Sequence, residues 1–144
     1  MAHKKIESPE ILWMYFEEYR THIKSHPYKI KDWVGRDGHE EFREKEKPLT
    51  MVGFENHLSD KNIIGELSDY FENADGRYAD FKKVCKRIRN TILQDHQEGA
   101  MTSMYHHGIT ARLNGWVDKI ENTNKNVPIL SIDPLDATTN NLTP

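Results

Sequence analysis

The chain has 144 residues, of which 36% are apolar and 30% are charged, and its formal net charge at pH 7 is -3. A chain of this length buries one modest core, and its weak negative charge excludes a uniformly basic nucleic-acid coat protein, so any contact with nucleic acid has to be local. The single cysteine, Cys85, excludes an internal disulfide, and no apolar run of membrane length or signal-peptide pattern is present. We therefore expect a cytosolic protein.

A first helix is predicted to begin at Ser8-Pro9-Glu10, where Ser8 is a favourable N-cap, Pro9 fits the first turn and Glu10 complements the helix dipole. Its predicted end is His26-Pro27. The apolar residues at helical spacing in between are Leu12, Tyr15, Phe16, Tyr19 and Ile23. This face is unusually aromatic, which fits either an ordinary core or a subunit interface.

Residues 28–47 are predicted to form an exposed β-hairpin or a flexible flap. The stretch from Tyr28 to Val34 alternates apolar and polar side chains imperfectly but with strand character. Gly35-Arg36-Asp37-Gly38 is typical of a turn, and the return stretch from His39 to Lys47 is highly charged. Runs of mixed charge usually form a solvated surface, so we expect this unit to lie outside the core.

Two short helices are predicted between Thr50 and Phe71. Thr50 is the expected N-cap of the first helix, whose apolar side ends at Leu58, and Asp60 is the expected cap of the second. Two short helices joined by a turn of about three to four residues have the geometry of a helix-turn-helix. As a DNA-reading motif the pattern is weak, because any two adjoining short helices produce it. Its candidate DNA-contacting cation is Lys61.

The stretch from Tyr78 to Leu113 has the pattern of a long buried helical face. Its apolar or small residues at helical spacing are Phe81, Val84, Cys85, Ile88, Ile92, Ala100, Met104 and Ala111. Gly99 and Gly108 lie inside it, and each costs about 1 kcal/mol relative to alanine in a helix interior. Either the helix breaks near Gly99 into two helices packed on each other or on neighbouring chains, or the glycines admit another helix at close range. We favour the first alternative, a long helical hairpin that ends at Asn114-Gly115.

Both sides of this helical stretch carry candidate functional residues. The apolar seam is a candidate oligomerisation surface, and its members are Ile88, Ile92, Ala100 and Met104. The other side is a basic run with only Asp80 nearby, and its members are Lys82, Lys83, Lys86, Arg87 and Arg89. These five cations and Lys61 are the candidate DNA-binding residues, because a local cluster of Lys and Arg neutralises phosphates.

After Gly115 the pattern changes to two short β-prone runs, Trp116–Ile120 and Val127–Ile132. Two strands alone are marginal in water, so we expect them to pair with strands of identical chains and to close a barrel between subunits, with Ile129 and Ile132 as interface residues. The predicted regions are an N-terminal helical region with the hairpin insertion (1–77), a central helical oligomerisation region (78–115), a strand region (116–133) and a flexible tail (134–144).

The sequence lacks the motifs of common catalytic and cofactor sites: it has no phosphate loop, dinucleotide-binding glycine pattern, zinc-type cysteine pair or nucleophile elbow. His22 and His26 have the spacing of two metal ligands on one helix face, but no third ligand falls in register. We therefore expect a mainly helical protein that is not an enzyme and holds neither a metal nor another cofactor.

Several segments, in order, resemble a known family. Glu7 to Trp13, with Tyr15-Phe16 after it, resembles the N-terminal helix of phage terminase small subunits of the DNA-packaging-protein type. Lys47 to Phe54 looks like the threonine-apolar-glycine start of the helical core in that family. Ile88 to Ala100 looks like its isoleucine, glutamine and glycine-alanine helix, and Gly108 to Gly115 is similar to its closing helical turn.

The resemblance implies a non-enzymatic ring, often a nonamer, that recognises viral double-stranded DNA in the host cytoplasm and passes it to the large terminase subunit. The large subunit carries the ATPase and nuclease, and a terminal tail of the small subunit contacts it. In similar proteins C-terminal strands form a β-barrel on the ring. Some relatives bind DNA through a basic C-terminal tail, whereas Asp133 to Pro144 has two acids and no base here. DNA contact is therefore expected at the basic helix or at the helix pair.

Two other readings remain open. A helix-turn-helix transcriptional regulator acting as a dimer should carry base-reading cations in its second helix, but Asn62 to Phe71 contains Glu66 and Asp69 and no cation. A purely structural oligomer predicts that neutralising the basic helix leaves DNA retention unchanged.

Overall fold

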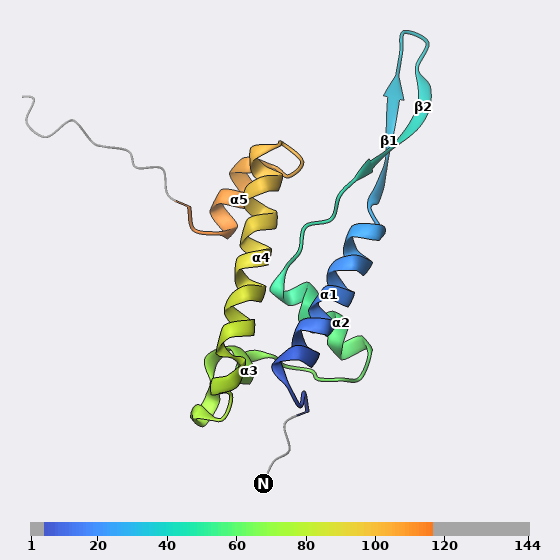
Figure 1. Ribbon diagram of the computed structural model, residues 1–144. Helices are drawn as coiled ribbons and strands as arrows, with labels where there is room; N and C mark the ends of the chain where they lie inside the picture. The colour runs from blue at the N-terminus through green and yellow to red at the C-terminus, as the bar shows by residue number, and fades with distance from the viewer. Residues whose placement is uncertain (1–4, 117–144) are drawn as a thin grey trace, which may run out of the picture.

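The computed structural model describes residues 5–116 of the chain, and Figure 1 gives their arrangement. The elements in chain order are α1 (Pro9–Ser25), β1 (Tyr28–Val34), β2 (His39–Lys45), α2 (Met51–Asp60), α3 (Ser68–Glu72), two 3-10 turns (Ala74–Gly76 and Ala79–Phe81), α4 (Lys82–Met101) and α5 (His107–Leu113). The prediction of a mainly helical fold with one antiparallel hairpin is confirmed. The predicted barrel strands with Ile129 and Ile132, and the tail, lie outside the described residues.

Helix α1 begins and ends where its sequence predicts. The Ser8 hydroxyl accepts a hydrogen bond from the Ile11 backbone N–H at 3.3 Å, and Pro9 occupies the first helical position. Leu12, Phe16 and Tyr19 are buried, so this part of the aromatic face belongs to the core of the chain itself.

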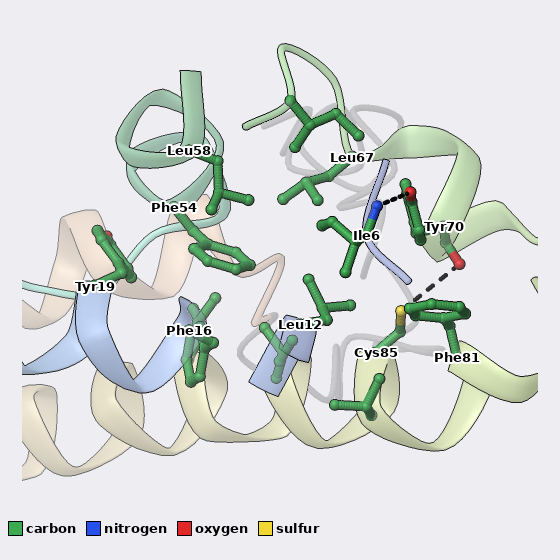
Figure 2. Packing of buried hydrophobic residues seen from close by; sticks show 14 of the residues in the cluster. Ile6, Leu12, Phe16, Tyr19, Phe54, Leu58, Leu67, Tyr70, Phe81 and Cys85 are labelled. Atoms are coloured by element: carbon green, nitrogen blue, oxygen red, sulfur yellow. Dashed lines mark hydrogen bonds between the residues drawn. The ribbon is translucent and has the colours of Figure 1, made fainter. Parts of the chain in front are cut away.

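The core lies between α1, α2 and α4 and includes residues from both the 1–77 and the 78–115 regions. Phe16 of α1 meets Phe54 of α2 edge-on, with ring centroids 5.3 Å apart, as Figure 2 shows. The Tyr70 hydroxyl accepts a hydrogen bond from the Ile6 backbone N–H at 2.9 Å and fastens the N-terminal segment over this core. Apolar packing of this kind contributes about 25 cal/mol for each Å² removed from water.

The predicted helix-turn-helix pair is wrong in its second helix. Helix α2 ends in a Schellman arrangement, with Asn62 in the left-handed region (φ 56°) and the Ile63 N–H bonded to the Leu58 carbonyl at 3.0 Å. Residues 61–67 then run as an irregular segment that is held by a hydrogen bond from the Leu67 N–H to the Glu55 carboxylate at 3.0 Å. Only five residues remain for α3, so the pair has a long connection and a short second helix.

The predicted long helical hairpin is present, because α5 folds back and packs against α4. The break comes after Met101, and Gly99 remains inside α4. A β-carbon at Gly99 would overlap the ring of Tyr105, so this glycine admits an aromatic side chain at close range. The predicted stop at Asn114-Gly115 is confirmed, with Gly115 at φ 67°.

The apolar seam of α4 faces the core of its own chain. Ile88 and Ile92 are only 0% and 7% exposed, so neither side chain is available to a second subunit in this fold. The helical spacing of apolar residues identifies a buried face but does not show whether the same chain or a second subunit covers it. For this reason the sequence analysis placed these two residues at a subunit contact. Ala100 is half-buried, and Met104 is exposed in the turn before α5.

The β1–β2 hairpin projects past the end of α1, away from the helices (Figure 1). Tyr28 pairs with Lys45 at its base and Val34 with His39 at its tip. Gly35 and Gly38 both have positive φ, 84° and 64°, which explains the two turn glycines. The prediction of an exposed hairpin is confirmed.

A polar cluster fastens the base of the hairpin to the helices, and we call it the Lys24 cluster. The Lys24 ammonium contacts the Asp95 carboxylate of α4, Glu46 at 2.8 Å and the Tyr105 hydroxyl at 2.9 Å. Burial lowers the pKa of Lys24, but the hydrogen bonds to Asp95, Glu46 and Tyr105 outweigh this and raise it overall. Asp95 also accepts a hydrogen bond from the Leu49 N–H at 2.8 Å.

No helix within residues 5–116 is long and apolar enough to cross a membrane.

Candidate nucleic-acid interface

Helix α4 carries five cations on the surface that its buried face leaves exposed. Val84, Cys85 and Ile88 point into the core, whereas the side chains on the exposed side are Lys82, Lys83, Lys86, Arg87 and Arg89. Within residues 5–116 none of these five cations forms an ion pair. Their charges are therefore not neutralised by the acids of the described chain and are available to an anion.

The side chain of Trp13 holds one of these cations in place. The Arg87 guanidinium lies 3.8 Å from the centre of the Trp13 ring, which is partly buried on the adjacent helix α1. A guanidinium stacked on an aromatic ring keeps its N–H donors in the plane of the group, where they remain free to bind phosphate. The stack therefore reduces the freedom of Arg87 without occupying its donors.

Helices α1 and α4 lie side by side and form a shallow groove of about 770 Å³ between their exposed faces. We call it the α1–α4 groove, and its lining residues are Trp13, Glu17, Arg20, Lys83, Lys86, Arg87, Asn90, Thr91 and Gln94. Four of these residues are cationic and one is acidic, and the acid, Glu17, is 3.4 Å from Arg20. The remaining lining is polar or aromatic, so the groove suits a negatively charged ligand with hydrogen-bond acceptors.

A second recess of about 350 Å³ shares Trp13, Lys83 and Arg87 with the groove. Glu10 and Asp80 line it as well, so acids bound the cationic surface at this end. From Lys83 to Arg87 the helix rises about 6 Å, which is close to two nucleotide steps of about 3.4 Å along the axis of a duplex. Each chain can therefore contact a short run of phosphates.

The predicted DNA-binding residues are divided among four places. Lys83, Lys86 and Arg87 lie together in the groove, and Lys82 lies at the first residue of α4. Arg89 is about 200° around the helix from Arg87 and lies over the ring of Phe71 at 5.0 Å.

Lys61 lies apart from the α4 cations, at the end of α2, where it forms an ion pair with Glu18 of α1. Its charge is largely matched by that partner. The structure therefore brings three of the six predicted cations into one groove.

Sequence reasoning missed Arg20 and Trp13 as members of this site. They occupy positions i and i+7 on α1, with Glu17 between them, so all three lie on one side of the helix. That side of α1 lies next to its buried stripe. The exposed Arg20 was the feature of the sequence that could have indicated a contact with an anion there. The sequence does not reveal that this side lies next to α4.

The histidines of α1 and α2 form a separate cluster. The ring of His22 lies 4.5 Å from that of His26 and 5.7 Å from that of His57, so the fold adds a third imidazole to the pair seen in the sequence. Nevertheless, no group of three His, Cys, Asp or Glu within residues 5–116 could hold a metal ion.

No protein-family model matches the chain, and no curated protein is significantly similar to it. The function has therefore to be inferred from the residues and their geometry.

Proposed function

We propose that the chain is the small terminase subunit of a tailed phage or prophage. In this proposal several copies form a ring in the host cytoplasm, bind viral double-stranded DNA, and recruit and regulate the large terminase subunit for genome packaging. The observation that carries the DNA-binding part is the α1–α4 groove, where Lys83, Lys86 and Arg87 form no ion pair with any acid of residues 5–116 and Arg20 lines the same groove. The family resemblance of residues 7–116 supplies the packaging context.

The chemistry of the groove favours the phosphate backbone as the ligand. Lys and Arg contacts to phosphate position a protein on DNA but do not read its sequence. Three such contacts per chain give only weak binding, but a ring presents the same groove several times, which raises the overall affinity through effective concentration. The net charge of -3 is consistent with local contact rather than with coating of DNA.

The self-association part of the proposal rests on other residues than Ile88 and Ile92. Met104 is exposed and Ala100 half-buried near the α4–α5 turn, and both remain candidates. Ile129 and Ile132 remain proposed interface residues of the strand region, and residues 134–144 are the proposed contact with the large subunit.

The alternative, a dimeric helix-turn-helix regulator, loses support from the geometry of its expected reading helix. Helix α3 has five residues, and its first turn carries Asp69 rather than a cation. A recognition helix needs several side chains that reach base edges in the major groove, and a helix of this length offers few.

The test is the salt dependence of binding to a labelled duplex, measured by fluorescence anisotropy for the wild type and for the triple variant Lys83→Gln, Lys86→Gln, Arg87→Gln. For each chain that contacts the duplex, loss of three phosphate contacts should make the slope of log K against log salt less steep by about 2.7 and weaken binding at 0.1 M salt by about two to three orders of magnitude. The loss should be similar for duplexes of unrelated sequence, because the removed contacts are to phosphate.

A matched control removes the same charge from the hairpin. Lys29, Arg36 and Lys45 are exposed and form no ion pair within residues 5–116, so their replacement by glutamine changes the net charge equally. This control should bind as the wild type does. Equal losses in both variants would refute the groove as the binding site, and a wild type that does not retain duplex DNA would favour a purely structural oligomer.

A further inference from the structure

Phosphate contacts alone leave one requirement of the proposed function unmet. A subunit that recognises viral DNA has to distinguish base sequences, and Lys or Arg contacts to phosphate carry no sequence information. Bases are read by side chains that reach their edges in the major groove, which is wide enough to admit an α-helix. Helix α3 has only five residues, so the side chains that read bases have to lie elsewhere.

Helix α4 has the length for this task, and one of its sides points away from the core. It has 20 residues, and Ile92 is among those that it buries. Asn90 and Gln94 each lie two residues from Ile92, which places both about 160° around the helix from that buried side chain. Both amide side chains are exposed. Because they are four residues apart, they are neighbours on the outer side of the helix.

Cations of the α1–α4 groove lie on the same side of α4 as these amides. Lys83 precedes Asn90 by seven residues and Lys86 precedes it by four, and both spacings return to nearly the same side of a helix. These two cations, Asn90 and Gln94 all line the groove. The outer side of α4 therefore carries groups that bind phosphate, followed further along by groups that can pair with bases.

The two amides have hydrogen-bonding groups that the fold does not use. The side chain of Asn90 forms no hydrogen bond within residues 5–116. Gln94 donates one N–H to the Glu98 carboxylate at 2.7 Å, which leaves its second N–H and its carbonyl oxygen. Thr91 differs, because its hydroxyl already donates to the Arg87 carbonyl at 2.8 Å. A side-chain amide with one N–H and its oxygen available matches N7 and the N6 amino group of adenine.

The β1–β2 hairpin is also rich in cations, but it lacks such amides. Residues 28–47 contain six Lys or Arg, six Asp or Glu, and no Asn or Gln. Acids therefore match the hairpin cations in number, and no side-chain amide accompanies them. Lys61, the remaining candidate cation, is held by Glu18. The combination of unpaired cations and available amides thus points to α4.

We infer that Asn90 and Gln94 read base edges in the major groove with a preference for adenine. The groove cations hold the phosphates beside them, and α1 lies over the rim of the major groove, where Arg20 meets the backbone. From Asn90 to Gln94 the helix rises about 6 Å, which is close to two base-pair steps of about 3.4 Å. The inference rests on the proposed DNA binding and names the residues that make this binding sequence-dependent.

The test is selection of bound duplexes from a labelled library whose central helical turn of about ten base pairs is random. The full-length wild type should enrich adenine at fixed positions about two base pairs apart. The affinities for an enriched duplex and for a shuffled duplex of the same composition are then compared by fluorescence anisotropy. Their ratio should be at least about five-fold for each base pair read, the lower end for a bidentate contact.

The double variant Asn90→Ala, Gln94→Ala should lose this preference through weaker binding of the enriched duplex. Both side chains are exposed, so the helical circular dichroism should match that of the wild type. The triple variant of the groove cations should instead weaken both duplexes and keep the preference, because it removes contacts to phosphate. As a control, Asn56→Ala removes an exposed amide of α2 and should keep both the affinity and the preference.

Three results would contradict the inference. A double variant that keeps the preference would overturn it. A wild type that binds the library without enriching any sequence would also overturn it, but this result would leave the phosphate contacts and the proposed function standing. A wild type that binds no duplex would refute the proposed DNA binding, and the inference with it.

A second measurement uses Asn90→Asp, which should produce a change that a purely structural role of Asn90 would not. A carboxylate accepts a hydrogen bond from the N4 amino group of cytosine but has no N–H to donate to adenine N7. At the position that Asn90 reads, the enriched base should therefore change from adenine to cytosine, while the position that Gln94 reads keeps adenine. Enrichment identical to that of the wild type would overturn the assignment of Asn90.

Discussion

Gly99→Ala is a sharp test of how the α4–α5 end is built, because two effects of opposite sign act at this position. Gly99 has ordinary helical backbone angles, so alanine should stabilise α4 by about 1 kcal/mol through helix propensity alone. The added methyl group, however, would overlap the ring of Tyr105. Which effect wins depends on how firmly that ring is held.

The Tyr105 hydroxyl lies in the Lys24 cluster. It is 2.9 Å from the Lys24 ammonium and donates to the Asp95 carboxylate at 3.1 Å. Hydrogen bonds to charged groups contribute about 1.5–3 kcal/mol each, and overpacking costs about 1–3 kcal/mol. Displacing the ring should therefore outweigh the propensity gain, and Gly99→Ala should lower the free energy of unfolding by about 2 kcal/mol.

The assay is urea denaturation of four proteins in a double-mutant cycle: wild type, Gly99→Ala, Tyr105→Ala and the double variant. In the Tyr105→Ala background the methyl group meets no ring, so Gly99→Ala should now stabilise by up to about 1 kcal/mol. The coupling energy should be about 3 kcal/mol. The reasoning is refuted if Gly99→Ala stabilises the wild type or if the two substitutions are additive.

Three further predictions concern the groove, the Lys24 cluster and Lys61. Trp13→Leu should weaken duplex binding about two- to five-fold in anisotropy assays, because it removes the cation-π contact with Arg87; unchanged affinity would exclude a role for the stack. Burial raises the pKa of Tyr105 from 10.0 to about 12, so the folded chain keeps a proton that the unfolded chain loses, and stability should fall between about pH 10 and 12. The free energy of unfolding of Tyr105→Phe, measured in urea, should not show the part of this fall that Tyr105 causes. A fall identical to that of the wild type would mean that other groups cause it. Lys61→Gln should change duplex affinity less than about two-fold and leave the salt slope unaltered, because Lys61 is paired with Glu18; a large loss would place DNA near α2.

Features set by neighbouring residues were predictable from the sequence. The Ser8 cap, the turn glycines of the hairpin and the stop at Gly115 each act within about four residues of chain, so their chemistry is visible in the order of amino acids. The irregular segment after α2 was not predictable, because it depends on the left-handed Asn62 and on the Glu55 carboxylate that holds the Leu67 N–H. Apolar spacing could not reveal this bond across the loop.

Features that depend on contacts between distant segments could be predicted only in part from the sequence. The pattern around Ile88 and Ile92 shows that a face is buried but not that α1 of the same chain buries it. In the same way, the cations of α4 could be found in the sequence. The sequence could not show that these cations share a groove with Trp13 and Arg20, because α1 and α4 are about sixty residues apart in the chain and come together only in the fold.

The native mass of the purified chain, measured by native mass spectrometry with and without a short duplex, tests the proposed packaging ring most directly. The proposal predicts a single closed oligomer of roughly eight to eleven copies. This oligomer should retain the duplex at low salt. The chain cut after Asn126 should lose or broaden that copy number, because the proposed barrel strand is removed. A monomer or simple dimer of the full chain would contradict the proposal.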